Sequence, residues 1–434
     1  MAKEKSIFVC DNCGFESLTW AGKCPACGEW NTFKQLKKIS TKMSDFGTNA
    51  PAQVLSLEQI KIQNFQRLNT TIEEFDRVLG GGILPSSIVL LAGEPGIGKS
   101  TLLLQIADTL SSKNNVLYVS GEESAQQLKM RCQRLKISCK NLKILSTIQL
   151  PAIIEACENY NPSLLIVDSI QSIYEPSFPA TAGSPVQIRE CTLRLQNLAK
   201  TTSTAVIVVG HITKEGAIAG PKLLEHIVDV VLYIEGQRFY DSRILQCIKN
   251  RFGPTDEIGV FQMGNLGLVE IKNPSKIFLE HRLKNVAGST VSAVIEGTRA
   301  FLVEIQALCT ATNFGYPLRR ASGFDLNRLL LIIAVLQKRA GLALYNQDVF
   351  VNVVGGLKIK EPAADLAVAL AIASALKNKV VSPDVCAFGE VGLSGEVRKV
   401  VHFEKRAKEA NRLGFNKILD TRTVLQAIKN AFES

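Results

Sequence analysis

GEPGIGKS, residues 93–100, fits the pattern G-x-x-x-x-G-K-[ST] at every required position. An apolar run at residues 88–92 leads into this stretch, and residues 101–110 favour a helix. The strand–loop–helix setting distinguishes a phosphate-binding loop, or P-loop, from a chance glycine-rich turn. It predicts an α/β fold that binds a nucleoside triphosphate, which we expect to be ATP.

Each part of the P-loop has its own role. The glycines let backbone N–H groups converge on the phosphates, and the helix N-terminus adds a favourable dipole. We expect Lys99 to reach the β- and γ-phosphates and the Ser100 hydroxyl to hold Mg²⁺. The residues expected to contact ATP are Gly93, Glu94, Pro95, Gly96, Ile97, Gly98, Lys99, Ser100 and Thr101.

Alternating apolar and helix-forming segments surround the P-loop. Strands are expected at residues 88–91, 116–120, 142–145, 164–168 and 205–210, with helices at 101–111, 124–135, 151–159 and 186–200. Such repetition predicts a parallel sheet with helices on both faces. After His211 the pattern changes to strands only, at residues 228–235, 243–249 and 259–263.

Acidic residues follow two of these strands. Asp168 ends an apolar strand, as does the carboxylate that supports Mg²⁺ in P-loop ATPases. Glu122 and Glu123 end a neighbouring strand, and one of them can polarise the attacking water as general base; Glu122 is our candidate, although the sequence does not separate the two. The alternative for this pair is an acidic bias at a helix start. His211 either senses the γ-phosphate or merely ends its strand.

Composition bounds the remaining possibilities. With 434 residues, 46% of them hydrophobic, the chain can form two or three domains with real cores. No run approaches the ~18–20 apolar residues of a membrane span, and the charged residues 1–5 do not resemble a signal peptide. Most of the 11 cysteines are scattered singly, which favours a reducing cytoplasm. The net charge of +10 suggests an acidic partner such as nucleic acid.

Four cysteines near the N-terminus form two CxxC pairs, Cys10 with Cys13 and Cys24 with Cys27. Each pair places two thiolates on one tight knuckle, and two knuckles close a tetrahedral zinc site. A redox-active CxxC is the alternative, but no thioredoxin-like βαβ pattern surrounds these pairs. We expect structural Zn²⁺, because four protein ligands leave no open position and so small a module needs metal to fold.

The finger, the P-loop and the pentapeptide KNRFG at residues 249–253 together resemble the bacterial RadA (Sms) family of DNA-repair proteins. KNRFG is that family's signature, and the match runs to the C-terminus. The family's ATPase core is similar to RecA and to DnaB-type helicases, which bind ATP between the subunits of a ring. The resemblance therefore implies that Lys249, with Arg251 beside it, neutralises charge on a neighbour's γ-phosphate. From the residues alone, both could be ordinary solvated charges.

The resemblance also suggests a DNA path. Residues 171–185 should form a long mobile loop, and residues 213–221 a second one with Lys214, followed by Lys222. In RecA-like rings such loops face the central channel, where lysines can hold phosphates without reading sequence. Plain surface loops are the alternative.

Residues 271–434 are similar to the peptidase domain of Lon. Segments at 292–296, 301–310, 326–339, 349–354 and an Ala-rich helix at 363–376 make an α/β unit. Lon uses a Ser–Lys dyad, whose positions align with Ala363 and Glu404 here, so neither a hydroxyl nucleophile nor an amine base remains. A one-residue shift would restore Lys405 but no serine. Proteolysis is not expected.

Charge suggests another use for this second domain. From Glu270 onward there are 23 Lys and Arg against 15 Asp and Glu. Basic clusters such as Arg319-Arg320 and Lys358/Lys360 suit DNA if the domain forms a ring, and Arg319 and Arg320 are our DNA-binding candidates. A solubilising surface is the alternative.

Four parts are therefore expected: a zinc finger at residues 1–33, a linker at 34–58, a RecA-like ATPase domain at 59–269 and an inactive Lon-like domain at 270–434. The resemblance implies a cytoplasmic, hexameric, DNA-dependent ATPase that uses Mg²⁺. It would act with RecA on single-stranded and branched DNA, promoting branch migration in repair. The competing hypothesis is an ATP-gated scaffold of the KaiC type, which moves nothing.

Overall fold

The computed structural model describes residues 7–10, 15–36, 66–138, 141–178, 180–211, 221–236, 242–312 and 316–432. Cys13, Lys214 and most of the expected linker lie outside these ranges. The chain divides into two compact units, with Ile271–Ser434 forming the bulk of the second. Within the described ranges, every helix is too short or too polar to cross a membrane.

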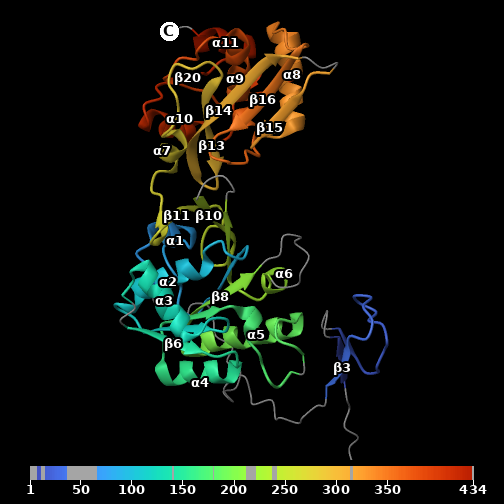
Figure 1. Cartoon of the computed structure of the whole chain (residues 1–434), viewed down its shortest axis with the longest axis vertical. Coiled ribbons are helices and arrows are strands. Elements are labelled where there is room, and N and C mark those ends of the chain that lie inside the picture. Colours follow the sequence, from blue (N-terminus) through green and yellow to red (C-terminus); the bar gives the residue numbers. More distant parts are fainter. Residues whose placement is uncertain are drawn as a thin grey trace, which may run out of the picture. The chain divides into compact units, whose positions relative to one another are not determined.

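A mixed α/β sheet dominates the first unit (Figure 1). Among the described residues it has nine strands in the order β12-β11-β10-β9-β4-β8-β7-β5-β6. Their bounds are β4 Ile88–Gly93, β5 Val116–Ser120, β6 Leu142–Ser146, β7 Leu164–Asp168, β8 Ala205–His211, β9 Val230–Gly236, β10 Ser242–Asn250, β11 Ile258–Gly264 and β12 Gly267–Glu270. Strands β4 to β9 are all parallel, whereas β10 runs antiparallel to β9. The parallel strands therefore end at one common edge, where α/β proteins bind ligands.

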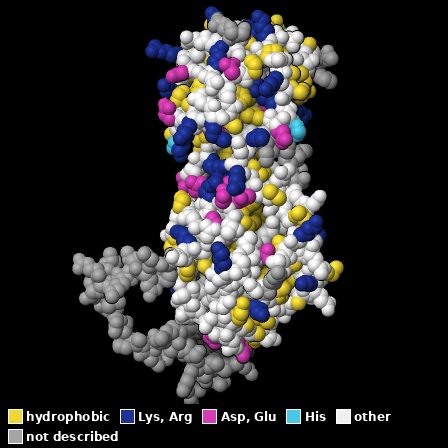
Figure 2. All heavy atoms as spheres, turned by 90° about the vertical axis from the view of Figure 1, so that its left-hand side faces the viewer, with side chains coloured by type: hydrophobic (Ala, Val, Ile, Leu, Met, Phe, Trp, Pro, Cys, Tyr) yellow, Lys and Arg dark blue, Asp and Glu magenta, His cyan; other side chains and the backbone are white. Residues whose placement is uncertain are grey.

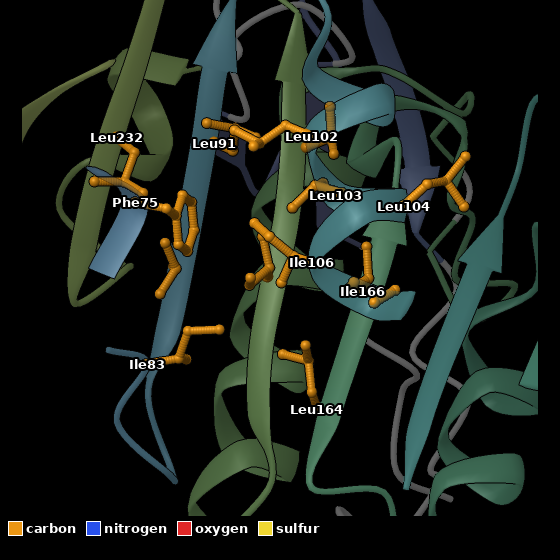
Figure 3. Close-up of a cluster of buried hydrophobic side chains, with 14 of the residues drawn as sticks. Phe75, Ile83, Leu91, Leu102, Leu103, Leu104, Ile106, Leu164, Ile166 and Leu232 are labelled. Carbon is orange, nitrogen blue, oxygen red and sulfur yellow. The ribbon is translucent and has the colours of Figure 1, made fainter. Parts of the chain in front are cut away.

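Helices cover both faces of this sheet, as the βα repetition predicted. They are α1 Glu73–Val78, α2 Lys99–Ser111, α3 Ala125–Leu135, α4 Leu150–Tyr160, α5 Pro185–Thr202 and α6 Pro221–Leu224. On one face, Leu102, Leu103 and Ile106 of α2 pack towards Leu91 and Ile166 of the strands (Figure 3). Helices α4 and α5 bury the other face. Because both faces are buried, the strands read as continuous apolar runs.

The expected loop at residues 171–185 contacts helix α5. Residues 171–185 were predicted to be long and mobile, but a short 3-10 helix, η2 Ile170–Ser172, begins them. The Gln187 side chain donates to the carbonyl oxygens of Glu175, Phe178 and Ala180, and Arg194 pairs with Glu175 at 2.7 Å. Helix α5 therefore holds the described part of this segment through side-chain hydrogen bonds, and its mobility stays a prediction.

The N-terminal region has little apolar core of its own. Its short strands are β1 Ile7–Cys10, β2 Glu16–Ser17 and β3 Phe33–Leu36. The buried cluster there consists of Cys10, Cys24 and Phe33. Trp20 and Trp30, by contrast, are 57% and 67% exposed. So small a core cannot stabilise a fold without a cross-link or a metal.

The second unit is a separate α/β layer structure. Its main sheet, among the described residues, has six strands in the order β15-β16-β14-β13-β17-β20. The elements are α7 Pro274–Leu279, β13 Ser289–Glu296, β14 Arg299–Ala311, β15 Arg319–Ser322, α8 Leu326–Ala340, β16 Gln347–Val353, η3 Pro362–Ala364, α9 Asp365–Lys377, β17 Val385–Cys386, β18 Glu390–Val391, β19 Val397–Arg398, α10 Phe403–Arg412, β20 Lys417–Ile418 and α11 Val424–Phe432. Helix α9, the predicted Ala-rich helix, is buried between the sheet and α8 and α11.

Candidate nucleotide-binding site

The P-loop joins β4 to α2 with the geometry that phosphate binding requires. Gly96 and Gly98 have φ values of 75° and 114°, a region that favours glycine. A Cβ on Gly98 would lie 2.7 Å from the Met263 Cε atom, but this is the movable end of a flexible side chain, so the positive φ is the main reason for glycine here. Helix α2 begins at Lys99, whose Nζ donates to the carbonyl oxygens of Gly93 at 2.8 Å and Glu94 at 3.0 Å. The lysine is thus enclosed by the loop that is predicted to hold the phosphates.

A cavity of about 400 Å³ opens beside the P-loop. Its walls bring together residues from the P-loop, the ends of β5, β7 and β8, and helix α3. They are Pro95, Gly96, Gly98, Lys99, Ser100, Thr101, Ser120, Glu122, Glu123, Arg131, Arg134, Asp168 and His211. The cavity therefore gathers Lys99, Ser100, Glu122 and Asp168, to which the sequence assigned separate roles in ATP chemistry.

Lys99 is poised electrostatically for an anion. Burial lowers the pKa of its ammonium group to about 8, while Asp168 and Glu122 act in the opposite direction. A buried cation of this kind gains most from a counter-charge brought by a ligand. The polyphosphate of ATP supplies such a charge.

Asp168 accepts a hydrogen bond from a tyrosine that the sequence analysis missed. It is the last residue of β7 and lies beside Ser120 in the register of β5. The buried Tyr118 hydroxyl donates a hydrogen bond of 2.6 Å to its Oδ2 atom. Burial, followed by the Asp168 charge, raises the pKa of Tyr118 well above its usual value, so the hydroxyl remains a donor. A tyrosine within an otherwise aliphatic strand was the available signal.

The two glutamates after β5 have different partners. The Ser169 hydroxyl donates to Glu122 at 2.5 Å, and His211 Nε2 lies 3.5 Å from the same carboxylate oxygen. Glu123 instead forms an ion pair with Arg131 at 2.5 Å. The Glu122 carboxylate is therefore the less neutralised of the two, which favours it over Glu123 as a base.

His211 lies in the cavity wall at the end of β8. Burial lowers its pKa, and the nearby Lys99 charge acts in the same direction. Its Nδ1 atom is buried and has no hydrogen-bond partner among the described residues. The lowered pKa favours the neutral imidazole, and Nε2 is the ring nitrogen that lies towards Glu122.

The KNRFG residues lie away from this cavity. Lys249 Nζ donates to the carbonyl oxygens of Glu225 at 2.5 Å and Val228 at 2.8 Å. Arg251 pairs with the buried Asp229 at 3.0 Å, and Asp229 also accepts from the amide of Ile88, the first residue of β4. The P-loop follows the other end of β4, roughly 17 Å away at 3.3 Å per residue. Lys249 and Arg251 therefore lie at the amino ends of the parallel strands, whereas their own P-loop follows the carboxyl end of β4.

The cysteine cluster fits a zinc ion. The sulfur atoms of Cys10, Cys24 and Cys27 lie within 4.8 Å of one another, and Cys10 and Cys24 are buried. Cys10 Sγ and Cys27 Sγ are 3.7 Å apart. Converging thiols from two knuckles are the donor set that structural zinc prefers.

The two peptidase positions of the second unit carry no dyad. Ala363 is buried in η3, and Glu404 is exposed at the start of α10. The charged groups nearby form ion pairs instead. Glu361 accepts two hydrogen bonds from the buried Arg406 at 2.7 and 2.5 Å, and the buried Asp365 pairs with Arg328.

The basic residues of this unit differ in availability. Arg319 donates to the carbonyl oxygens of Leu318, Leu344 and Gln347, whereas its neighbour Arg320 is exposed, as are Lys358 and Lys360. On the face drawn in Figure 2, Lys and Arg side chains of this unit are spread among acidic and apolar groups. Lys222 lies in α6, but its side chain is outside what the structure describes.

Family models match three parts of the chain. An AAA domain matches residues 55–217, a rubredoxin metal binding domain matches residues 8–35, and subunit ChlI of Mg-chelatase matches residues 330–423. These matches agree with a RecA-like ATPase core, a zinc-binding N-terminal region and a Lon-like second unit.

Curated relatives match almost the whole chain. "DNA repair protein RadA" of Bacillus subtilis (strain 168) is 50% identical over 96% of this chain and 93% of its own length. The proteins of the same name from Listeria monocytogenes serovar 1/2a and Streptococcus pyogenes serotype M1 are 49% and 46% identical, covering 96% and 99% of this chain and 92% and 95% of their own. A solved KaiC-like protein from Pyrococcus horikoshii OT3 is 20% identical with a TM-score of 0.41, over 48% of this chain and 99% of that chain. That likeness is too low to support an argument.

Proposed function

The chain belongs to the RadA family of DNA repair proteins, and we propose on this basis that it is a DNA-dependent ATPase. It works as a ring-shaped motor that promotes branch migration and processing of recombination intermediates together with RecA. One observation carries the proposal: a single cavity of a RecA-like sheet gathers Lys99, Ser100, Glu122, Asp168 and His211. The names of the relatives support the DNA-repair setting.

The cavity suits hydrolysis of the γ-phosphate. Glu122, oriented by the Ser169 hydroxyl, accepts a proton from water while the water oxygen bonds to the γ-phosphorus. The bond to the bridging oxygen breaks, leaving ADP and phosphate. Lys99 neutralises the charge that develops on the phosphates, and the neutral His211 can donate to the γ-phosphate from Nε2, the nitrogen that lies 3.5 Å from Glu122. Mg²⁺, when bound, would be held by Ser100 and Asp168 and would neutralise β- and γ-phosphate charge.

Lys249 acts on a neighbouring subunit's nucleotide. What supports this is the geometry within one chain, because Lys249 and its own P-loop belong to opposite edges of the sheet. A subunit then completes its site only in a closed homo-oligomer, which we propose to be a hexamer. Arg251 stays paired with Asp229 and keeps the KNRFG segment next to β4.

DNA follows the channel of this ring. The segment with Lys214 and Lys222 faces single-stranded DNA, and the exposed Arg320 contributes phosphate contacts from the second unit. Arg319 contributes less, because its guanidinium group is bonded to backbone carbonyl oxygens. The second unit has no peptidase activity, since Ala363 and Glu404 stand at the dyad positions.

Zinc has a structural role. Cys13 completes the ligand set of Cys10, Cys24 and Cys27, giving one zinc ion per chain. Metal analysis of purified protein should find that ion. The variant Cys24→Ala should lose it while the ATPase core stays folded.

The rate of ATP hydrolysis, with and without single-stranded DNA, tests the proposal. We expect little phosphate release from the protein alone and several times more with an unstructured oligonucleotide. An equal rate in both conditions, with ATP still hydrolysed, would favour an ATP-gated scaffold of the KaiC type. Absence of ATP binding would overturn the ATPase assignment itself.

A further inference from the structure

Two arginines of helix α3 line the nucleotide cavity, and nothing in the P-loop chemistry above uses them. Helix α3 starts immediately after the two glutamates, where Ser124 and Gln127 form a reciprocal capping box. Long side chains on a helix point back towards its N-terminus. Arg131, two turns into the helix, therefore reaches the end of β5, and Arg131 and Arg134 both contribute to the cavity wall.

The balance of charge in the cavity indicates a need for cations beyond Lys99. Glu122, Glu123 and Asp168 bring three carboxylates, whereas Lys99 is the one cation that the P-loop supplies. An ATP molecule adds roughly four further negative charges, of which bound Mg²⁺ offsets two. Without further cations the filled site would hold a large excess of negative charge. Arg131 and Arg134 are the described residues of the wall that correct it.

We place Arg131 near the γ-phosphate because its ion-pair partner is next to the proposed base. Its partner Glu123 adjoins the proposed base, Glu122, and the ion pair is short, at 2.5 Å. The Arg131 charge also acts on Tyr118, whose hydroxyl supports Asp168. Both side chains of the ion pair keep about a quarter of their surface exposed, at 25% and 28%. Such a pair contributes little to stability, and it can exchange one partner for another.

We propose that Arg131 is a γ-phosphate ligand within its own subunit, held by Glu123 until the phosphate takes the place of that carboxylate. The inference rests on the proposed ATPase function and adds a residue to it. An arginine suits the task, because its planar guanidinium group forms paired hydrogen bonds with phosphate as readily as with carboxylate. Arg131 thereby distinguishes ATP from ADP, which lacks the group that displaces Glu123.

Calorimetric titration of the full-length protein with ADP and with a non-hydrolysable ATP analogue tests this inference. Arg131→Ala should weaken binding of the analogue tenfold or more, because a charge-assisted pair is lost, and should change ADP binding less than twofold. Lys129→Ala is the matched control, since Lys129 is an exposed cation of the same helix that does not line the cavity. It should bind both nucleotides as the unmodified protein does.

Glu123→Gln separates a phosphate ligand from a merely structural ion pair. Removing the competing carboxylate should strengthen binding of the analogue severalfold, and this gain should vanish when Arg131→Ala is combined with it. Equal losses for ADP and the analogue in Arg131→Ala, or no loss for either, would overturn the inference. If the unmodified protein bound neither nucleotide, the proposed ATPase function would fail instead, so the two failures are distinguishable.

Discussion

Charged residues are arranged in opposite ways at the nucleotide cavity of the first unit and at the aligned peptidase position of the second. In the first unit, Lys99, Glu122 and Asp168 line a cavity, and Lys99 is held there with a lowered pKa. In the second, Arg406 is 1% exposed and is bonded to Glu361, next to the aligned peptidase position. Buried charges that are satisfied by one another stabilise a particular packing, whereas charges left around a cavity await a ligand. The contrast agrees with the proposal that the first site binds a nucleotide and that the second has no peptidase activity.

The largest effect is expected from removing Lys99, the cation that the P-loop contributes to the cavity of the first unit. Lys99→Ala should lower ATP hydrolysis a thousandfold or so, because the phosphate charge loses its fixed counter-charge in a water-excluded site. Phosphate release in the presence of single-stranded DNA measures the effect. Lys113→Ala, an exposed lysine just past the same helix, should change nothing. DNA-stimulated hydrolysis that survived in Lys99→Ala would refute the assignment.

In the second unit, the same kind of substitution should act on stability. Arg406→Ala leaves Glu361 without its partner and should lower the free energy of unfolding of that unit by about 3–5 kcal/mol. Denaturant unfolding measures the loss. The exposed Glu404→Ala should stay within about 0.5 kcal/mol of the parent. Neither protein should cleave unfolded substrates, and peptidase activity in the parent that Glu404→Ala removed would reverse our reading of this unit.

Lys249 extends the comparison to the contact between subunits. It is hydrogen-bonded to carbonyl oxygens of its own chain, yet we propose that it acts on the nucleotide of a neighbouring subunit. Lys249→Ala should still bind ATP through its intact P-loop but hydrolyse it about a hundredfold more slowly. Mixing Lys249→Ala with Lys99→Ala subunits should restore part of the activity, since some interfaces then pair an intact P-loop with an intact lysine. No recovery in rings shown to be mixed would favour a role within one subunit.

The pKa of Lys99 predicts a pH dependence for the first unit. Its value of about 8 in the folded protein lies below the usual 10.5, so the empty site loses its proton as the pH rises through 8. Burying the charged Lys99 lowers the free energy of unfolding by its full amount below pH 8, and this destabilisation decreases between pH 8 and 10.5 as the lysine loses its proton in the folded protein. Affinity for an ATP analogue should therefore fall above pH 8, by up to tenfold per pH unit. A flat profile between pH 7 and 10 would contradict it.

The smallest expected effect distinguishes two neighbours of the second unit. Arg320→Ala should weaken DNA binding a few-fold and reduce the salt dependence by about one phosphate contact. Arg319→Ala should mainly lower stability, because its guanidinium group holds backbone carbonyl oxygens. Fluorescence anisotropy at several salt concentrations, alongside thermal unfolding, separates these effects. The opposite pattern would assign Arg319 to DNA.

Local signals explain why much of the fold could be predicted. The P-loop glycines and the apolar runs are local features, and β5 and β7 begin and end where the sequence analysis expected, at Val116–Ser120 and Leu164–Asp168. The carboxyl ends of parallel strands meet at one edge, so the gathering of Lys99 and Asp168 also followed from the sequence.

Contacts between distant residues explain what could not be predicted. Sequence reasoning could not separate Glu122 from Glu123, because the difference lies in Ser169 and Arg131, which tertiary packing brings to them. The sequence offered Arg319 and Arg320 as equal candidates, and only the neighbouring strand and loop reveal that carbonyl oxygens hold Arg319. The anchoring of the loop before α5 likewise depends on one buried glutamine, Gln187.

The exposed tryptophans of the N-terminal region have an optical consequence. The chain has two tryptophans, Trp20 and Trp30, and both belong to the cysteine-bearing module. Emission excited at the red edge of the indole band therefore reports on that module alone, while the ATPase core and the second unit stay dark. Loss of the proposed zinc ion is therefore expected to change this emission in the intact protein, with no added dye. A tryptophan introduced at the nucleotide cavity would give the core a signal of its own.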